Sequence, residues 1–457
     1  MPQLFELTAT EAAKKMRQRD LSPVELVESL ISRVDSLEPR LNAWVYLDRE
    51  AVLADARDKE AEIGSSTKLG PLHGVPIGLK DIYYTAGIPT TACSKVYADF
   101  VPDYDATTVS LLKQAGAIML GKTVTTEFAC MDPSPTINPW NPAHTPGGSS
   151  SGSAVAVATG MCPAALGSQT VGSVLRPASY NGVVGFKPTF GRVSRYGVIP
   201  VSWSLDHVGW MARSVADIAL LLTVMAVPDS HEPITQRQPS SEFVSLNVMA
   251  GLESPHAPRI GVIRRFFYDH ADRETCQHTD GVLDQLARAG AMVEEISLPD
   301  SIDTAIEDQR VIMAVEGAAF HQPTFERQPE DYQPGLREML RRGLATDGPT
   351  YSRALERRQQ FIAEMESLAE KVDVLLTPST PTPALADLTN TGNTMFQGPW
   401  TSCGLPAITI PSGLAASGLP FGIQLIGGSF AEARLLGAAS WCEKALDVHL
   451  APSVDGQ

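Results

Sequence analysis

The first sixty residues show the apolar spacing of amphipathic helices. Thr8 and Glu11 form a capping box ahead of a helix predicted over residues 12–19, and Ser22 and Glu25 form a second one. Apolar side chains then recur every three or four positions over residues 26–37. Residues 1–64 are therefore predicted to form an N-terminal helical arm packed on the core.

After residue 64, short apolar runs alternate with helical stretches and with Gly, Pro and Thr punctuation. Strands are predicted over residues 75–79, 117–120, 183–186, 260–263, 292–298, 372–376, 407–411 and 421–426. Helices are predicted over residues 105–115, 154–159, 279–288, 351–370 and 431–446. Residues 228–258 have weak periodicity and are predicted to be a long surface connection. The alternation indicates an α/β architecture with a central sheet.

Composition and charge narrow the class of protein. The 457 residues are 43% hydrophobic, enough for a large core, and the net charge of −16 disfavours a nucleic-acid partner. No apolar run reaches 18 residues, and no basic start precedes an apolar stretch at the N-terminus. We therefore expect a soluble, cytoplasmic protein with no membrane partner.

The chain has six cysteines and nine histidines. None lies in a Cys-x-x-Cys or His-x-x-x-His pair, so we expect free thiols and no metal site.

Two stretches match the residue pattern of a well-known motif but lack the local structure that the motif needs. Residues 116–123 match a phosphate-binding loop, but Ala117 to Leu120 is itself a predicted strand and cannot wrap a phosphate. Residues 148–152 match Gly-x-Ser-x-Gly with Ser150 as the nucleophile. A nucleophile elbow needs a strand leading into it, and residues 138–146 contain three prolines. Neither motif is expected to function.

Three other features carry candidate chemistry. Lys80 ends a strongly apolar run, so it is either a residue at the edge of the fold that extends its amine to water or a buried amine. Residues 146–153 are small and polar and open an apolar helix, where backbone amides collect partial positive charge. Ser173 follows Gly172 at a sharp turn, where neighbouring amides can converge as an oxyanion hole.

At these residues the sequence resembles the amidase signature family. The resemblance runs from residue 69 to the C-terminus and is densest over 69–211. Its segments occur in the family's order: Gly70–Asp81, Gly121–Thr123, Glu127–Phe128, Asn138–Pro142, Pro146–Ala154, Gly172–Ser173, Arg176–Ala178, Gly182–Thr189, Gly404–Pro411 and Gly418–Gly427.

The resemblance implies a fold, a mechanism and a set of site residues. The fold is one α/β catalytic domain, residues 65–457, with a mixed, twisted central sheet flanked by helices. Ser173 is the implied nucleophile, Ser149 the bridging serine with a cis peptide bond, and Lys80 the base. The amides of Thr170, Val171, Gly172 and Ser173 would form the oxyanion hole, with no cofactor and no metal.

The proposed base must be neutral to accept a proton. Burial in an apolar run disfavours a charged ammonium and lowers the pKa of Lys80. The apolar run that Lys80 ends is therefore consistent with the role of a neutral base that the resemblance implies for it.

Two departures and two binding residues complete the sequence picture. Gln169 and Val171 stand where the family commonly has Asp and Gly, which affects the loop geometry but no proton-transfer group. Arg176 is either a ligand for a substrate carboxylate or a structural residue, and both roles stay open. Gly148 is a further candidate substrate-binding residue.

The expected function is hydrolysis of a C–N bond in a small-molecule amide, carbamate or ureide through a Ser acyl-enzyme. The first alternative is the A subunit of a tRNA-dependent glutamine amidotransferase, and the second is a non-catalytic binding protein of the same fold. The substrate is the only expected partner, and a homodimer is left open. The substrate pocket is expected to draw on residues 396–403 and on loops between about 300 and 350.

Overall fold

The computed structural model describes residues 3–65, 69–237, 248, 252 and 255–454. Within these residues eleven strands form one sheet in the order β1-β3-β2-β4-β6-β5-β10-β11-β9-β7-β8. The strands are β1 (Trp44–Tyr46), β2 (Pro76–Lys80), β3 (Ile118–Thr123), β4 (Ala164–Gln169), β5 (Val184–Lys187), β6 (His207–Ala212), β7 (Arg259–Val262), β8 (Met292–Glu295), β9 (Val374–Pro378), β10 (Ala407–Leu414) and β11 (Pro420–Ile426).

The sheet is mixed, as predicted. Strand β2 runs parallel to both β3 and β4, and β7 runs parallel to β8 and β9. The remaining neighbours, from β4 through β6, β5, β10 and β11 to β9, and β1 with β3, are antiparallel. The parallel group β3-β2-β4 matters most here, because its carboxyl ends carry the candidate chemistry.

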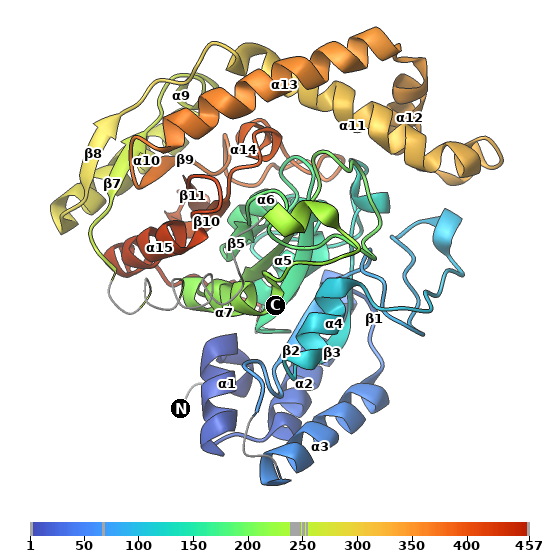
Figure 1. The fold of residues 1–457 in the computed structure, drawn as a ribbon. Helices are drawn as coiled ribbons and strands as arrows, with labels where there is room; N and C mark the ends of the chain where they lie inside the picture. The colour runs from blue at the N-terminus through green and yellow to red at the C-terminus, as the bar shows by residue number, and fades with distance from the viewer. Residues whose placement is uncertain (1–2, 66–68, 238–247, 249–251, 253–254, 455–457) are drawn as a thin grey trace.

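Helices cover both faces and both ends of the sheet (Figure 1). They are α1 (Ala9–Gln18), α2 (Pro23–Leu41), α3 (Arg49–Ser65), α4 (Thr107–Gln114), α5 (Ser151–Ala158), α6 (Leu175–Asn181), α7 (Val215–Met225), α9 (Phe267–His270), α10 (Arg273–Ala289), α11 (Ile302–Phe325), α12 (Pro334–Ala345), α13 (Gly348–Ala369), α14 (Gly398–Ser402) and α15 (Glu432–Leu446). Helices α1–α3 lie at one end of the molecule, and α11–α13 lie together at the other.

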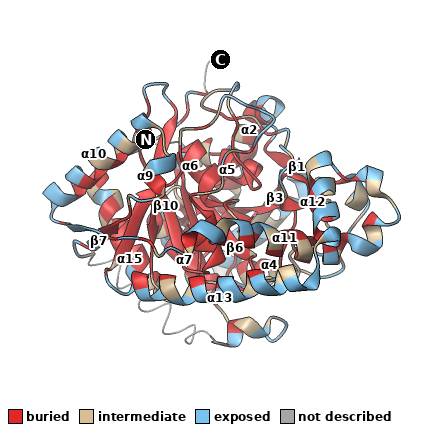
Figure 2. Cartoon of the chain, turned by 90° about the horizontal axis from the view of Figure 1, so that it is seen from above, coloured by how far each residue is buried: buried red, intermediate tan, exposed pale blue. Residues whose placement is uncertain are grey.

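The two helices that flank the candidate site are deeply buried. All seven residues of α6 are buried, as are the first seven of α5 (Figure 2). Small side chains make this packing possible: a Cβ on Gly152 would lie 2.3 Å from the carbonyl oxygen of Ala43. The sequence between these helices is therefore flanked on both sides by buried, closely packed helices.

Most elements lie where the sequence predicts them. Both capping boxes are present, with Thr8 and Ser22 as N-caps, although α1 begins at Ala9 rather than residue 12. The predicted helical arm also contributes the three-residue strand β1, which pairs with β3. Most of the predicted connection over residues 228–258 lies outside the described residues.

One expectation is wrong. The stretch between about 300 and 350 is not built of loops: residues 302–325 form α11 and residues 334–345 form α12, which pack against each other. Helix α11 has buried residues around much of its circumference and a proline, Pro323, near its end, so its sequence lacks a clear apolar stripe.

The two motif matches set aside from sequence are structurally explained. Residues 118–123 form β3, and Lys122 is buried, with Nζ donating to the carbonyl oxygen of Tyr83 (2.6 Å) and to Thr90 Oγ1 (2.7 Å). Residues 124–150 contain no strand, so nothing leads into Ser150 as an elbow requires.

Candidate active site

The candidate residues meet at the carboxyl ends of two parallel strands. Lys80 is the last residue of β2, and the turn of residues 170–173 follows β4 directly. Strands β2 and β4 are hydrogen-bonded neighbours, with Leu79 opposite Leu166. In α/β sheets ligands bind at this edge of parallel strands, so the topology alone places these residues at a binding edge.

Lys80 is a fully buried amine held between two hydroxyls. Its Nζ lies 2.6 Å from Ser149 Oγ and 2.9 Å from Ser168 Oγ, and its exposed fraction is 0%. Burial lowers the pKa of Lys80 from 10.5 to about 7, against the opposing charge of Asp206. Of the two positions left open by the sequence, the buried amine is the one observed.

Ser168 is a site residue that sequence analysis missed. It faces the amine from β4, which neighbours β2, and nothing in the apolar run before it marks it. Its place five residues before Ser173 was the only available signal.

Ser149 enters the site through an unusual backbone. The Gly148–Ser149 peptide bond is cis, as the family resemblance implies, and the Ser149 side chain is buried. The Ser149 carbonyl oxygen accepts a hydrogen bond from the Thr126 amide (3.1 Å), and the amide of the next residue, Ser150, donates to the Ser173 carbonyl oxygen (3.3 Å). These bonds connect residues 146–150, which we call the serine loop, to the turn that carries Ser173.

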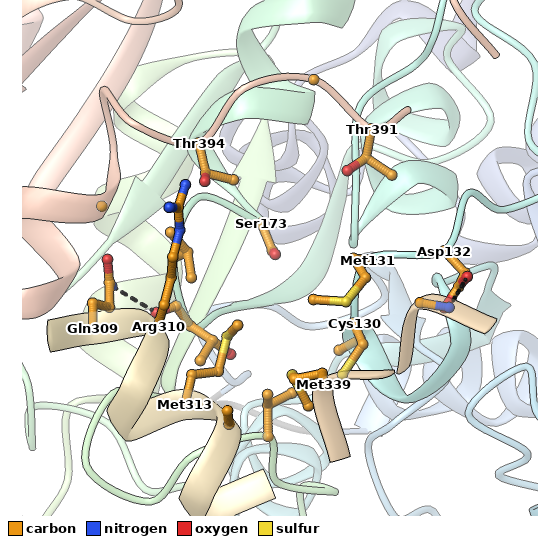
Figure 3. Close-up of a pocket in the computed structure, with 18 of the residues that line it drawn as sticks. Cys130, Met131, Asp132, Ser173, Gln309, Arg310, Met313, Met339, Thr391 and Thr394 are labelled. Carbon is orange, nitrogen blue, oxygen red and sulfur yellow. Dashed lines mark hydrogen bonds between the residues drawn. The ribbon is translucent and has the colours of Figure 1, made fainter. Parts of the chain in front are cut away.

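Ser173 faces an open cavity of about 660 Å³ that it helps to line. The residue is half-buried, and its hydroxyl points into this space (Figure 3). Within the described part of the chain its Oγ has no hydrogen-bond partner. The structure therefore shows the contact between Lys80 and Ser149, while the step from Ser149 to Ser173 remains part of the proposed mechanism.

The side chains of Gln169 and Thr401 hold the loop of residues 170–173, where the sequence predicts an oxyanion hole. Gln169 Oε1 accepts hydrogen bonds from the Val174 and Leu175 amides (2.9 and 3.0 Å), and its Nε2 donates to Thr401 Oγ1 (3.0 Å). Thr401 Oγ1 in turn donates to the Val171 carbonyl oxygen (2.7 Å). Gln169, a departure from the family's usual residue, thus supplies hydrogen bonds that fix the loop and the start of α6.

This fixation leaves backbone donors free. In residues 171–173 the backbone amides have no acceptor among the described residues, so they are available to a ligand. Gly172 packs closely against Gln397: a Cβ here would lie 2.7 Å from Gln397 Oε1, so that side chain would have to move. Val171, the second departure, is accommodated beside this glycine and lines the cavity.

Arg176 is buried, and its guanidinium is bonded to the chain itself. Nη2 donates to the Gly148 carbonyl oxygen (2.6 Å) and to Thr391 Oγ1 (3.1 Å), and Nη1 donates to the Gly392 carbonyl oxygen (2.6 Å). Burial lowers the pKa of Arg176 to about 10. Gly148 is therefore a residue whose carbonyl group is held by Arg176, and Arg176 connects the serine loop to residues 391–392.

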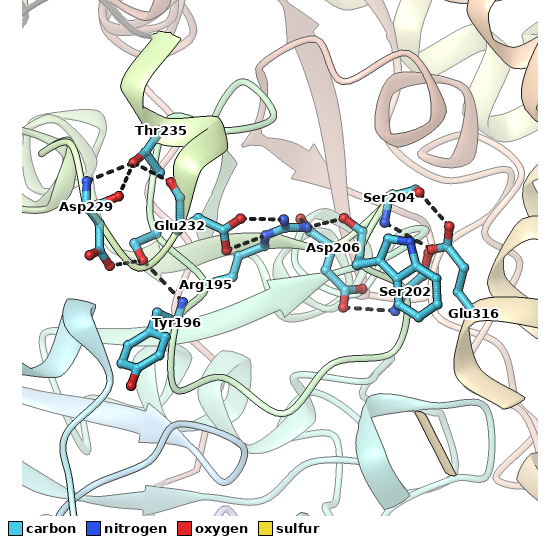
Figure 4. Close-up of polar contacts among 11 residues, drawn as sticks. Arg195, Tyr196, Ser202, Ser204, Asp206, Asp229, Glu232, Thr235 and Glu316 are labelled. Atoms are coloured by element: carbon cyan, nitrogen blue, oxygen red, sulfur yellow. Dashed lines mark hydrogen bonds and ion pairs between the residues drawn. The ribbon is translucent and has the colours of Figure 1, made fainter. Parts of the chain in front are cut away.

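Asp206 and Glu316 take part in a polar network with residues 201–204 (Figure 4). Thr170 Oγ1 donates to Asp206 Oδ1 (2.6 Å), while Asp206 Oδ2 accepts from the Val201 and Ser202 amides (2.8 and 2.9 Å). Glu316 on α11 accepts from the Ser202 hydroxyl. The network links the loop of residues 170–173 to α11, which lines one side of the cavity.

The described residues contain no group of three or more His, Cys, Asp or Glu side chains arranged to hold a metal ion. Among the described helices, none has the length and apolar character needed to span a bilayer.

Comparison with known proteins matches this geometry to one family. The model of the Amidase family matches residues 25–436. A putative amidase, AmiD, of Mycobacterium bovis is 36% identical over 98% of this chain and 95% of its own length. The A subunit of the glutamyl-tRNA(Gln) amidotransferase of Geotalea daltonii is 34% identical over 98% of this chain and 99% of its own length.

Solved structures give the same result. The peptide amidase of Stenotrophomonas maltophilia has a TM-score of 0.87 at 30% identity, covering 98% of this chain and 99% of its own. The 6-aminohexanoate cyclic dimer hydrolase has a TM-score of 0.86 at 28% identity, covering 99% and 100%. The resemblance inferred from the motifs is confirmed: the chain belongs to the amidase family and is a hydrolase of C–N bonds.

Proposed function

We propose that Ser173 is the nucleophile of this hydrolase, with Ser149 and Lys80 as its proton relay and the amides of residues 170–173 as its oxyanion hole. The observation that carries the proposal is the 2.6 Å contact between a fully buried Lys80 amine and Ser149, beside the cavity that Ser173 lines. An amine in this setting is readily neutral, which a base requires.

Acylation follows from these positions. Ser173 Oγ forms a bond to the substrate carbonyl carbon while its proton passes to Ser149 and the Ser149 proton passes to Lys80. The carbonyl oxygen gains negative charge, which the free loop amides stabilise. The C–N bond then breaks, and the proton returns through Ser149 to the leaving nitrogen.

Deacylation uses the same groups with water in place of Ser173. Water attacks the ester carbon, its proton enters the relay, and the bond to Ser173 Oγ breaks as that oxygen regains a proton. The products are an acid and an amine or ammonia. No cofactor is needed for any step.

The substrate class proposed is a small-molecule amide, with carbamates and ureides as chemically equivalent candidates. The names of the similar peptide amidase and cyclic dimer hydrolase support amide bonds outside ordinary peptide chains. The homodimer and the cytoplasmic location stay predictions.

A second candidate is the glutaminase reaction of an amidotransferase, supported by relatives at 34% identity over nearly the whole chain. Release of ammonia from glutamine, measured with and without the other amidotransferase subunits, separates the two. Activity on simple amides without partners favours the independent amidase.

The acyl-enzyme is tested by partitioning with hydroxylamine. During turnover of an amide, hydroxylamine intercepts the ester at Ser173, and a hydroxamate forms in competition with the acid. Ser173→Ala should produce neither product above background. Formation of acid alone at saturating hydroxylamine would argue for direct attack by water.

A further inference from the structure

Four methionines surround the cavity in front of Ser173. Met131 follows the short turn after β3, Met313 lies on α11, Met339 on α12 and Met395 just before α14. We call these four residues the methionine wall. Figure 3 shows Met131, Met313 and Met339 around the space that the Ser173 hydroxyl faces. Four separate chain segments thus present thioethers to one cavity.

The inner charged groups of the cavity are already bonded to the protein. Both carboxylate oxygens of Asp132 accept backbone amides at the start of α12, from Gly335 and Leu336 at 2.8 Å each. Arg176 is held by the carbonyl groups of Gly148 and Gly392. These backbone contacts hold both groups against the protein, and Nε of Arg176 has no partner among the described residues.

The remaining charges lie at the exposed mouth. Arg310 and Arg342 both pair with Glu307, and Glu338 is exposed. The lining therefore combines the four thioethers and apolar side chains such as Val201 and Ile306 with uncharged polar residues such as Gln309, while the exposed charged side chains lie at the rim.

We propose that the substrate is an amide bearing an uncharged aromatic group that lies against the methionine wall, an inference that rests on the function proposed above. Thioethers are polarisable and adaptable in shape, and they make favourable contacts with aromatic rings. A cavity of about 660 Å³ is in the range of pockets that enclose a small organic ligand.

A free amino-acid amide such as glutamine fits this cavity poorly. Its ammonium and carboxylate groups would need partners when they lose water, and both oxygens of Asp132 and both terminal nitrogens of Arg176 already bond to the protein. The same wall that favours an aryl group therefore disfavours glutamine.

The test compares kcat/KM for phenylacetamide, propionamide and glutamine. Wild-type protein should prefer phenylacetamide over propionamide at least about tenfold, in line with the discrimination that apolar pockets achieve. Met313→Gln and Met395→Gln keep side-chain length and add polarity at two half-buried positions. Each should reduce the preference about fivefold, mainly through KM.

Two variants serve as controls. Met313→Leu keeps an apolar surface and should retain most of the preference, while Met292→Gln changes a methionine that is 62% exposed on β8, outside the cavity, and should have no effect. Thermal unfolding of each variant confirms that it is folded.

The proposal would be overturned if Met313→Gln and Met395→Gln both kept the wild-type preference for phenylacetamide over propionamide. It would also be overturned if the wild type had a higher kcat/KM for free glutamine than for phenylacetamide. The absence of phenylacetamide turnover in protein that a fluorophosphonate labels at Ser173 would overturn it as well. Failure of that labelling would instead reject the function proposed above, so the two failures are distinguishable.

Discussion

The side-chain nitrogen of Lys80 and the hydroxyl oxygen of Ser149 lie 2.6 Å apart, and both side chains are almost completely shielded from solvent. No carboxylate of the described residues forms an ion pair with Lys80. A charged ammonium at this position would lack water and a directly paired carboxylate, and the charge of Asp206 offsets only part of the cost of burial, so the surroundings favour the neutral amine. This relationship underlies the first prediction.

Activity should rise with pH through the titration of Lys80. Burial lowers the pKa of this amine to about 7, so the neutral base is scarce below that value and dominant above it. For a neutral amide, kcat/KM should increase about tenfold per pH unit on the acidic side and level off above about pH 7. A profile that is flat from pH 5 to 9, with chemistry shown to be limiting, rejects Lys80 as the base.

Lys187 provides a matched control for this profile. It is also fully buried, burial also lowers its pKa to about 7, and its Nζ donates to the Leu405 and Pro188 carbonyl oxygens rather than to a site residue. A folded Lys187→Met variant should keep the wild-type profile, whereas Lys80→Met should be inactive at every pH.

Ser149→Ala should lower kcat by about 10²–10³-fold, because it breaks the relay between Lys80 and Ser173. The loss should be smaller than that of Ser173→Ala, because a water can occupy the vacated space and pass a proton. Steady-state kinetics with a neutral amide measure the effect. Ser151→Ala, which removes a hydroxyl bonded to Ser134 instead, should change kcat little. Wild-type rates in Ser149→Ala would exclude the bridging role.

Gln169→Ala should reduce kcat more than it raises KM, because the loop of residues 170–173 loses its support. We expect a loss of about 10–100-fold in kcat, together with a lower melting temperature from the unpaired amides of Val174 and Leu175. Gln169→Glu retains the acceptor for these amides and should recover part of kcat. An equally large defect in both variants would show that acceptance from the two amides is not what matters.

The sequence predicted β2, β3 and the residues of the candidate triad, but not β4, β6 or α6. Lys80 ends a strongly apolar run, and Ser149 and Ser173 lie among small residues. Local pattern and family resemblance therefore point to the same three residues. Ser168 and the support role of Gln169 were missed, because each depends on contacts between segments far apart in the chain, such as Gln169 with Thr401.

The substrate side of the cavity could not be predicted in the same way. Helix α11 buries residues such as Gln309 and Glu316 alongside apolar ones, which obscures its periodicity. Whether Met313 and Met339 face one cavity depends on how α11 and α12 pack, and sequence spacing does not determine that packing.

Arg176 should act through protein structure rather than through substrate charge. Arg176→Ala removes bonds to Gly148 and Gly392 and should lower thermal stability. It should reduce kcat/KM by the same factor for an anionic amide and for its neutral ester analogue. A selective loss for the anionic substrate would restore the alternative in which Arg176 binds a carboxylate.

The central claim, that Ser173 is the nucleophile, is tested most directly by covalent labelling with a fluorophosphonate and mass mapping of the modified residue. The proposed mechanism predicts stoichiometric labelling of Ser173 in the wild type and in Ser150→Ala. It also predicts no labelling of Ser173→Ala, with turnover lowered by at least about 10³-fold. Stoichiometric labelling at Ser150, or at any residue other than Ser173, would contradict it.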